Sequence, residues 1–337
     1  MSRSTPTLSV ILPTFNAATW LPDTLRHLRA AIHEADAWDA EIIVVDDGST
    51  DETPALLAND CGAPHLTVVT QPNGGRFRAR AAGVNAATGD FVLFIDSRVH
   101  AHPSSLRFLR NQLTTHPERV VWNGHVTTAQ GASFFTRFWD AITFLAWRAY
   151  LREPRLVSYG LDEYDLYPKG TTFFAAPREW LVDACNGFES AYLDLRHAND
   201  DTLMIRPIVE RANINMSPDF SCTYFPRDSA RKFLSHSFHR GTVFVDGYYR
   251  PGTRFYRPLQ VLTVLAPVAL LLGGRHPKLA VLAASTGSAI LGIVARVAGV
   301  PRRNAVALGS LAPMFGVAYG TGIARGLVMR WGSRRPK

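Results

Sequence analysis

The chain has 337 residues, of which 47% are hydrophobic, 19% charged and 11% aromatic; it can form one large domain or two and is far too apolar for a disordered chain. Its three cysteines exclude a disulfide framework and a CxxC zinc site. The net charge of +8 comes from residues 258–337, which hold ten Lys and Arg and no acid, so we expect a membrane surface and no nucleic acid as partner.

Residues 1–100 alternate short apolar runs with segments of helical periodicity. The runs at 8–12, 41–45, 65–69 and 90–95 indicate buried strands. Between them, the pattern predicts helices at 21–32 and 78–87, and a capping box at 49–52 opens another. Apolar strands joined by helices predict an α/β fold with a mostly parallel, Rossmann-like sheet covered on both faces.

Polar residues gather directly after each of the four predicted strands, at residues 13–16, 46–47, 73–75 and 96–98. Each of these groups, taken alone, is typical of an ordinary turn. Because ligands bind at the carboxyl ends of parallel strands, the four groups together predict a nucleotide pocket.

The same segments carry a family resemblance. Residues 9–16, 45–51, 73–80 with Gly83, and 94–96 resemble the successive motifs of family 2 glycosyltransferases. The resemblance covers roughly residues 8–240. It implies a nucleotide-binding GT-A fold and transfer of a sugar from a nucleoside diphosphate with inversion.

The resemblance also implies a donor site. Asp47 would accept a hydrogen bond from the base, Pro13 and Asn16 would line the nucleoside, and Arg80 would face the phosphates, where a guanidinium fork matches their geometry. Asp46 has the alternative role of capping or orienting its neighbour. The implied donor residues are Pro13, Asn16, Asp46, Asp47, Arg76, Arg80, Asp96, Ser97 and Arg98.

The fourth strand end departs from the family's Asp-x-Asp motif, whose carboxylates grip the ribose and a divalent cation such as Mg²⁺. Here the motif is Asp96, Ser97 and Arg98. Three interpretations compete: Asp96 with His100 or His102 holds Mn²⁺, which tolerates imidazole; Arg98 replaces the metal; or Arg98 pairs with a surface acid.

Residues 199–206 resemble the family's Glu-Asp motif with its downstream Arg, and residues 186–188 stand where the family has a Gly-Gly-Phe-Asp loop. The resemblance makes Asp201 the catalytic base. Its neighbour Asp200 would raise the pKa of Asp201 through like charge. Alternatively, the two acids simply begin a helix at its positive end.

Two segments, 134–151 and 229–244, interleave aromatic and basic residues. They fit interfacial helices near a lipid acceptor, with the aromatics in the headgroup layer; the first also fits an ordinary core helix. The predicted acceptor and membrane-interface residues are Phe138, Trp139, Trp147, Arg148, Arg231, His239 and Arg240.

The tail contains three apolar stretches, 259–274, 279–300 and 305–322, and the last two are long enough to span a membrane. Two spans, with 259–274 in plane or re-entrant, would leave only Arg302 and Arg303 outside, as the positive-inside tendency favours; three spans remain an alternative. The basic residues kept inside would be Arg325, Arg330, Arg334, Arg335 and Lys337. Similar tails occur in succinoglycan-biosynthesis-type members of the family. The predicted division is 1–226 catalytic, 227–257 interfacial, 258–325 membrane and 326–337 basic tail.

These features together predict a membrane-anchored inverting glycosyltransferase of cell-envelope polysaccharide biosynthesis. It would use a nucleoside-diphosphate sugar, of uridine type, and a lipid-linked or surface-glycan acceptor. The apolar run at residues 8–12 is too short for a secretory signal, so we expect a multi-pass inner (plasma) membrane protein with a cytosolic catalytic domain. The alternative is a catalytically silent nucleotide- or glycan-binding scaffold. A nucleotidyltransferase is disfavoured because no Gly-rich loop follows the first strand.

Overall fold

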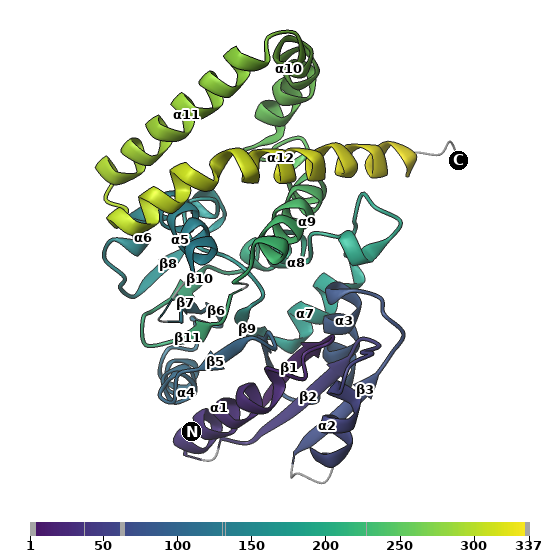
Figure 1. The fold of residues 1–337 in the computed structure, drawn as a ribbon. Helices are drawn as coiled ribbons and strands as arrows, with labels where there is room; N and C mark the ends of the chain where they lie inside the picture. Colours follow the sequence, from purple (N-terminus) through teal and green to yellow (C-terminus); the bar gives the residue numbers. More distant parts are fainter. Residues whose placement is uncertain are drawn as a thin grey trace.

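A computed structural model shows a mixed α/β fold with two sheets and a group of long C-terminal helices (Figure 1). The structure describes residues 5–36, 38–60, 65–129, 131, 133–226 and 228–333. The large sheet has the order β3-β2-β1-β4-β9-β6-β10-β8, and the small sheet has the order β5-β11-β7. The strands are β1 (Leu8–Thr14), β2 (Ala40–Asp46), β3 (Leu66–Thr70), β4 (Phe91–Ile95), β5 (Val99–Ala101), β6 (Val121–Asn123), β7 (His125–Thr128), β8 (Val157–Tyr159), β9 (Phe173–Pro177), β10 (Ile214–Met216) and β11 (Ser221–Tyr224).

The first half of the large sheet is parallel, as the sequence predicts. β1 lies between β2 and β4 and is parallel to both, and β3 continues the parallel order beyond β2. The helices around the sheets are α1 (Leu21–Glu34), α2 (Thr53–Asp60), α3 (Arg76–Ala86), α4 (Ser105–Thr115), α7 (Arg178–Asn186) and α8 (Asp200–Val209), with short 3-10 turns η1 (Leu161–Glu163) and η2 (Leu195–His197).

The second half of the sheet is mixed, because β9 and β8 are reversed, but β6 and β10 run in the same direction as β4. The expectation of a mostly parallel sheet is therefore confirmed. β9 runs antiparallel to both β4 and β6, and Phe173 at its start pairs with Ile95 at the end of β4. This reversal brings the residues just before β9 to the same edge as the carboxyl ends of β1, β2 and β4.

Two helix starts differ from the predicted ones. The capping box at residues 49–52 does not form: α2 begins at Thr53, whose N–H donates to Asp51 Oδ1 at 3.0 Å. The Ser49 hydroxyl instead accepts a hydrogen bond from the N–H of Asn16 at 2.9 Å, which ties two strand-end loops together. The helix predicted from residue 78 begins at Arg76. Its N-cap, Gly75, has a φ of 87°, a conformation that glycine adopts readily and that separates the loop from the helix.

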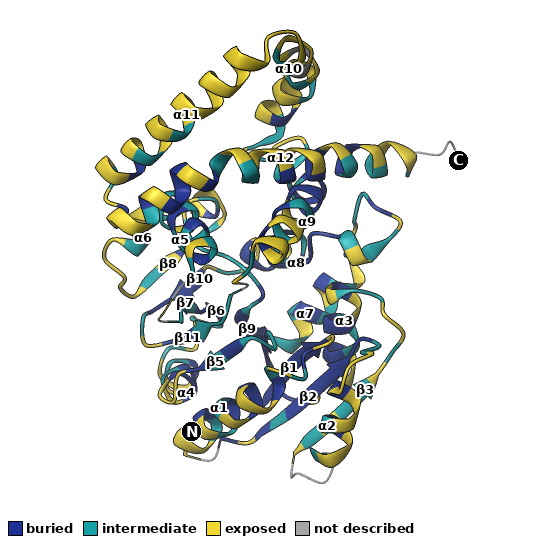
Figure 2. Cartoon of the chain, viewed as in Figure 1, coloured by how far each residue is buried: buried dark blue, intermediate teal, exposed yellow. Residues whose placement is uncertain are grey.

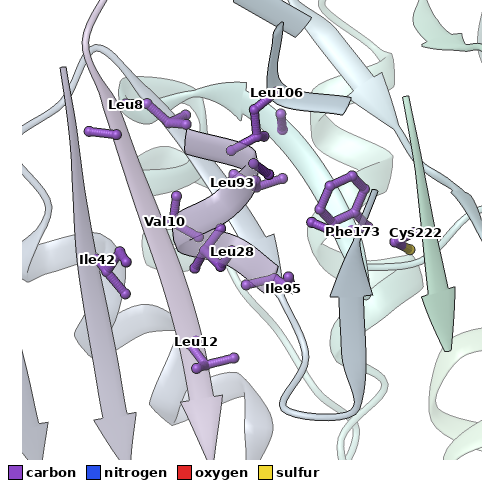
Figure 3. Packing of buried hydrophobic residues seen from close by; sticks show 14 of the residues in the cluster. Leu8, Val10, Leu12, Leu28, Ile42, Leu93, Ile95, Leu106, Phe173 and Cys222 are labelled. Atoms are coloured by element: carbon purple, nitrogen blue, oxygen red, sulfur yellow. The ribbon is translucent and has the colours of Figure 1, made fainter. Parts of the chain in front are cut away.

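Both faces of the large sheet are covered by apolar side chains. On one face Val10, Leu93 and Ile95 pack with Leu28 of α1 and Leu106 of α4 (Figure 3). These side chains are entirely buried, so truncating one of them, as in Leu28→Ala, costs about 2–5 kcal/mol. The sheet is thus a rigid support for the loops at its edge.

The aromatic segment of residues 134–151 forms α5 (Phe134–Ala146) and the short α6 (Arg148–Leu151). Phe138 is 1% exposed and packs edge-on against Phe233 of α9 (Ala230–Tyr248). The expectation that Phe138 lies in a membrane interface is therefore wrong: it is a core residue, because α5 is covered by α9 and α12. Trp139, its neighbour in sequence, is only partly buried.

The tail forms three helices, α10 (Tyr256–Arg275), α11 (Pro277–Val297) and α12 (Arg302–Gly332). All three are long and apolar enough to cross a membrane by length and composition. They differ in burial: α10 and α11 stand out from the domain with exposed surfaces, whereas α12 lies along α5 and α9 (Figure 2). The predicted basic residues Arg334, Arg335 and Lys337 lie outside the described residues.

α9 and α12 pack backbone to backbone through glycines. A Cβ added to Gly322 would clash with the carbonyl oxygen of Phe238, and one added to Gly241 would clash with the carbonyl oxygen of Tyr319. The Thr242 hydroxyl donates to the carbonyl of Gly322 at 3.1 Å across this crossing. Only residues without a side chain allow so close an approach, so α12 is fixed to the domain.

Candidate active site

One cavity of about 530 Å³ opens at the carboxyl ends of β1, β2 and β4 and continues to α5, α6 and α9. The sequence-predicted residues that line it are Pro13, Asn16, Asp47, Arg76, Asp96, Ser97, Arg98, Trp139, Trp147, Asp201 and Arg240. It therefore joins predicted donor residues at one end to predicted acceptor residues at the other, with Asp201 among them.

Asp47 organises the glycine loop that precedes α3. Its carboxylate accepts hydrogen bonds from Gln71 Nε2 at 2.6 Å and from the N–H groups of Gly74 and Gly75, each at 2.8 Å. A carboxylate has about four lone-pair sites, so one acceptor position remains for a ligand. Asp46 takes the capping role: it is buried, and its carboxylate accepts a hydrogen bond from the Ser49 N–H at 3.0 Å in the turn that follows β2.

A buried ion network lies behind the cavity wall. Arg80 is 1% exposed; its guanidinium pairs with Asp200, and it donates to Asp96 Oδ1 at 2.7 Å. Arg76, one turn earlier on α3 with a side chain 48% exposed, pairs with the other oxygen of Asp200 at 2.9 Å. The expectation that Arg80 faces the phosphates is thus corrected. Arg80 links the fourth strand end to the start of α8, and Arg76 is the arginine of α3 that lines the cavity.

Asp200 and Asp201 begin α8, and Asn199 is its N-cap. The expectation that the two acids begin a helix is therefore confirmed. Asp200 is buried and faces the arginines. Asp201 lines the cavity and accepts from the N–H of Thr171 at 3.0 Å and from the Thr171 hydroxyl. The two neighbours on α8 therefore face different surroundings.

The pKa order of the two acids is the reverse of our expectation. Burial raises the pKa of Asp200 above its usual value despite Arg76 and Arg80. Burial also acts to raise the pKa of Asp201, but Arg76, Arg80 and the Thr171 donors outweigh it and lower that pKa to about 2. Asp201 is consequently ionised at neutral pH, whereas a base with a pKa raised by Asp200 was expected.

The predicted Mn²⁺ site of Asp96 with His100 or His102 does not form. His100 stacks on His27 with ring centroids 4.0 Å apart, and burial lowers its pKa to about 4. His102 contacts Thr223 at 3.3 Å. Within the described ranges, no three His, Cys, Asp or Glu side chains converge as metal ligands. Arg98 lines the cavity with its guanidinium 5.0 Å from the centre of the Trp20 ring.

The acceptor end of the cavity combines aromatic and basic side chains from α5, α6 and α9. Trp139, Trp147, His236 and Arg240 line it, and the Arg240 guanidinium lies 5.8 Å from the centre of the Trp139 ring. Of the other predicted interface residues, Arg148 and Arg231 are exposed at the surface, and the His239 ring lies 6.0 Å from His197. The structure thus brings together only part of the predicted set.

Two residues that matter to the site were not among the predicted ones: Phe15 lines the cavity, and Thr171 is buried beside it. Phe15 is 48% exposed at the end of β1, a position suited to stacking on a planar base. Thr171, the donor to Asp201, precedes β9, a strand that the sequence analysis did not predict. An exposed aromatic after a buried strand was a usable signal for Phe15, but nothing in the sequence pointed to Thr171.

Comparisons with known proteins agree with this architecture. Residues 9–175 match the profile of the family described as glycosyl transferase family 2. Among solved structures, a mannosyltransferase from Pyrobaculum calidifontis in complex with GDP-Man and Mn²⁺ aligns with a TM-score of 0.55 and 17% identity, covering 95% of this chain and 87% of that one. Residues 1–349 of TarS from S. aureus in complex with UDP-GlcNAc align with a TM-score of 0.50 and 18% identity, covering 97% and 91%.

The fold is of the GT-A class. The chain belongs to glycosyl transferase family 2. An undecaprenyl-phosphate 4-deoxy-4-formamido-L-arabinose transferase from Sodalis glossinidius is 34% identical over 102 residues, which is 29% of this chain and 31% of that protein. The uncharacterized glycosyltransferase YibD of Escherichia coli is 35% identical over 106 residues, or 31% and 29%. The chain thus spans about a third of the length of these curated relatives.

Proposed function

We propose that this chain is a membrane-anchored inverting glycosyltransferase that moves a sugar from a nucleoside diphosphate, of uridine type, to a lipid-linked or surface-glycan acceptor. The observation that carries the proposal is one cavity that holds guanidinium groups, Arg76 and Arg98, and the ionised carboxylate of Asp201. Family membership supports it, and so does the name of the relative from Sodalis glossinidius, an undecaprenyl-phosphate sugar transferase.

In the donor complex, the diphosphate competes with Asp200 for Arg76, whose half-exposed side chain is free to reach into the cavity. A guanidinium forms two parallel hydrogen bonds with phosphate oxygens as readily as with a carboxylate. Withdrawing Arg76 from the acids removes one of the charges that depress the pKa of Asp201. Donor binding therefore strengthens Asp201 as a base at the moment when a base is needed.

In the reaction, Asp201 takes the proton of the acceptor hydroxyl as that oxygen attacks the anomeric carbon. The bond from this carbon to the diphosphate breaks on the opposite face, and the nucleoside diphosphate leaves with the electron pair. The new glycosidic bond has the inverted configuration. Asp200, which is buried against two arginines, holds the start of α8 and makes no contact with substrate.

The residues at the fourth strand end do not fit a resident divalent cation. A hard cation requires several oxygen ligands, and Asp96 already uses one carboxylate oxygen for Arg80 and the other, at 3.2 Å, for the hydroxyl of Thr172. We therefore assign neutralisation of the leaving diphosphate to Arg76 and Arg98 and derive no step through a metal.

The acceptor end favours an amphipathic substrate. Trp139 and Trp147 offer flat apolar surfaces for a sugar ring or the start of a lipid chain, and Arg240 and His236 offer charge for a phosphate. Because α5 and α9 are the helices that α12 covers, this end of the cavity lies on the side of the exposed tail helices (Figure 1).

The structure leads us to revise the expected membrane topology. We propose that α10 and α11 form the membrane-inserted hairpin and that α12 lies along the membrane surface, with the catalytic domain, residues 1–226, in the cytosol. α10 and α11 are exposed and apolar, whereas α12 is bound to α5 and α9 along its length. This arrangement puts Arg302, Arg303, Arg325 and Arg330 on the cytosolic side and Arg275 and Lys278, at the turn of the hairpin, on the other side. The larger number on the cytosolic side is in keeping with the positive-inside tendency.

Donor turnover by the detergent-purified protein tests the function. A panel of nucleoside-diphosphate sugars is scored for released diphosphate with membrane lipid extract as acceptor, in Mg²⁺, Mn²⁺ or EDTA. We expect activity that survives EDTA and falls by about 10²–10⁴-fold in Asp201→Asn, because the general base is lost. Asp219→Asn, an exchange away from the cavity lining, is the matched control. Absence of donor binding across the panel would favour the scaffold instead.

A further inference from the structure

We propose that Asp246 of α9 is a positioning residue that holds the loop 190–199, here called the catalytic loop, in place. In this proposal α9 also couples the position of α12 to the position of Asp201. This inference rests on the proposed function of Asp201. It starts from a carboxylate that is 0% exposed and lies outside the cavity lining. This carboxylate accepts hydrogen bonds from the loop 190–199 and pairs with Arg250, one turn further along the chain, at 3.6 Å.

The Asp246 carboxylate binds the segment that leads into α8 at three points. One oxygen accepts from the N–H of Ala191 at 2.7 Å; the other accepts from the Ser190 hydroxyl at 3.0 Å and from the N–H of Asn199 at 2.8 Å. Asn199 directly precedes Asp200 and Asp201. A buried charge so fully hydrogen-bonded fixes both ends of the loop 190–199 against α9.

Asn199 is held by α9 at further points. Its Nδ2 donates to the carbonyl of Val243 at 3.4 Å, and its Oδ1 accepts from the N–H of Thr202, which caps α8. A Cβ added to Gly247 would clash with the Asn199 side chain, so that glycine is needed for the close fit. The first turn of α8, which carries Asp201, therefore takes its position from α9.

The link continues from α9 to α12. The two helices meet at the glycine crossing of Gly241 and Gly322, and the Tyr192 hydroxyl from the loop donates to the carbonyl of Thr242 at 2.7 Å. α12 also reaches the loop directly, because Arg325 Nη2 donates to His197 Nε2 at 2.8 Å. The helix that we place on the membrane surface thus contacts both α9 and the catalytic loop.

This arrangement predicts a specific kinetic signature. Displacing the loop moves Asp201 relative to the acceptor hydroxyl but leaves Asp47, Asp96 and Arg98 at the strand ends. Misplacing a catalytic group by about 1 Å costs up to about 100-fold in rate. Loss of Asp246 should therefore lower kcat and spare donor binding, whereas general loosening of the fold would affect both.

The experiment compares Asp246→Asn with Asp228→Asn, a matched control at an exposed acid just before α9. We expect kcat to fall by about 10- to 100-fold in Asp246→Asn, with the Kd for UDP and the donor KM within about twofold of wild type. Arg325→Gln, which leaves the buried carboxylate intact, should show a smaller fall of the same kind. Unchanged kcat in both variants, or a fall matched by weaker UDP binding, would overturn the proposal.

Amide hydrogen exchange gives a readout that does not need turnover. We expect the amides of Ala191 and Asn199 to exchange faster in Asp246→Asn, while those of β1 keep the wild-type rate. If the wild-type chain turns over no donor but this local change appears, the proposed function fails and the structural link stands. Wild-type exchange at both amides in the variant would refute the link whatever the activity.

Discussion

The buried pair of Arg80 and Asp200 gives the strongest stability prediction for the site. Arg80→Met keeps most of the side-chain volume but leaves the Asp200 carboxylate with Arg76, whose side chain is half exposed, as its only ion-pair partner among the described residues. Removing one partner of a buried ion pair costs about 3–5 kcal/mol, because the charge that has lost this partner stays in a medium of low dielectric. For a domain of this size, that corresponds to a fall in Tm of about 6–20 °C.

Thermal unfolding in detergent, followed by circular dichroism, measures this effect. Arg78→Met on the exposed face of α3 is the control, and we expect it to change stability by less than about 0.5 kcal/mol. The loss in Arg80→Met should shrink between pH 8 and pH 5. Burial already raises the pKa of Asp200, and without Arg80 the folded state takes up a proton more readily than the unfolded one. A Tm equal to that of Arg78→Met would refute the reasoning.

Three further predictions concern charge, packing and the acceptor. Arg76→Gln should move the acid inflection of the kcat/KM profile to higher pH, because a charge that lowers the pKa of Asp201 is lost; an unmoved or lower inflection would contradict this. Gly322→Leu should destabilise the protein by about 1–3 kcal/mol in thermal unfolding, since its side chain would clash with the Phe238 carbonyl, and wild-type stability would show that the crossing is loose. Trp139→Ala should raise the acceptor KM several-fold with little change in the donor KM, measured by varying each substrate, and the opposite pattern would place Trp139 at the donor.

The sequence predicts well which residues meet at the donor end of the cavity, because this depends on patterns within short segments of the chain. Apolar runs that fit buried parallel strands must end at one edge of the sheet, so the polar residues after them meet there. Asn16, Asp47 and Asp96 are therefore found together, as expected, although no single motif required it. The same reasoning could not foresee that β9 runs antiparallel, because its five residues carry no signal that distinguishes them from a helix or a loop.

The roles of the charged residues could not be assigned from the sequence. Arg76 and Arg80 are one turn apart on α3, and helical spacing gives no reason to prefer either as the phosphate ligand. The distinction arises because α8 packs its first turn over Arg80, 120 residues later in the chain. The pKa order of Asp200 and Asp201 also depends on contacts made by distant residues. Burial raises the pKa of Asp200, whereas at Asp201 the two guanidinium groups together with the Thr171 donors outweigh burial.

The tail shows the limit of hydropathy as a guide to topology. By length and composition, α12 could cross a membrane as well as α11. The two sides of α12, however, differ in burial. Val306, Val317 and Val328 are each eleven residues apart, which is about three helical turns, so these exposed side chains form one line along the helix. Leu308, Gly322 and other buried residues lie on the opposite side, against the domain. A helix with one face fixed to a folded domain and one apolar face exposed suits a membrane surface better than a bilayer interior, where both faces would meet lipid. In the proposed topology, the domain meets the membrane through the helix that also contacts its catalytic loop.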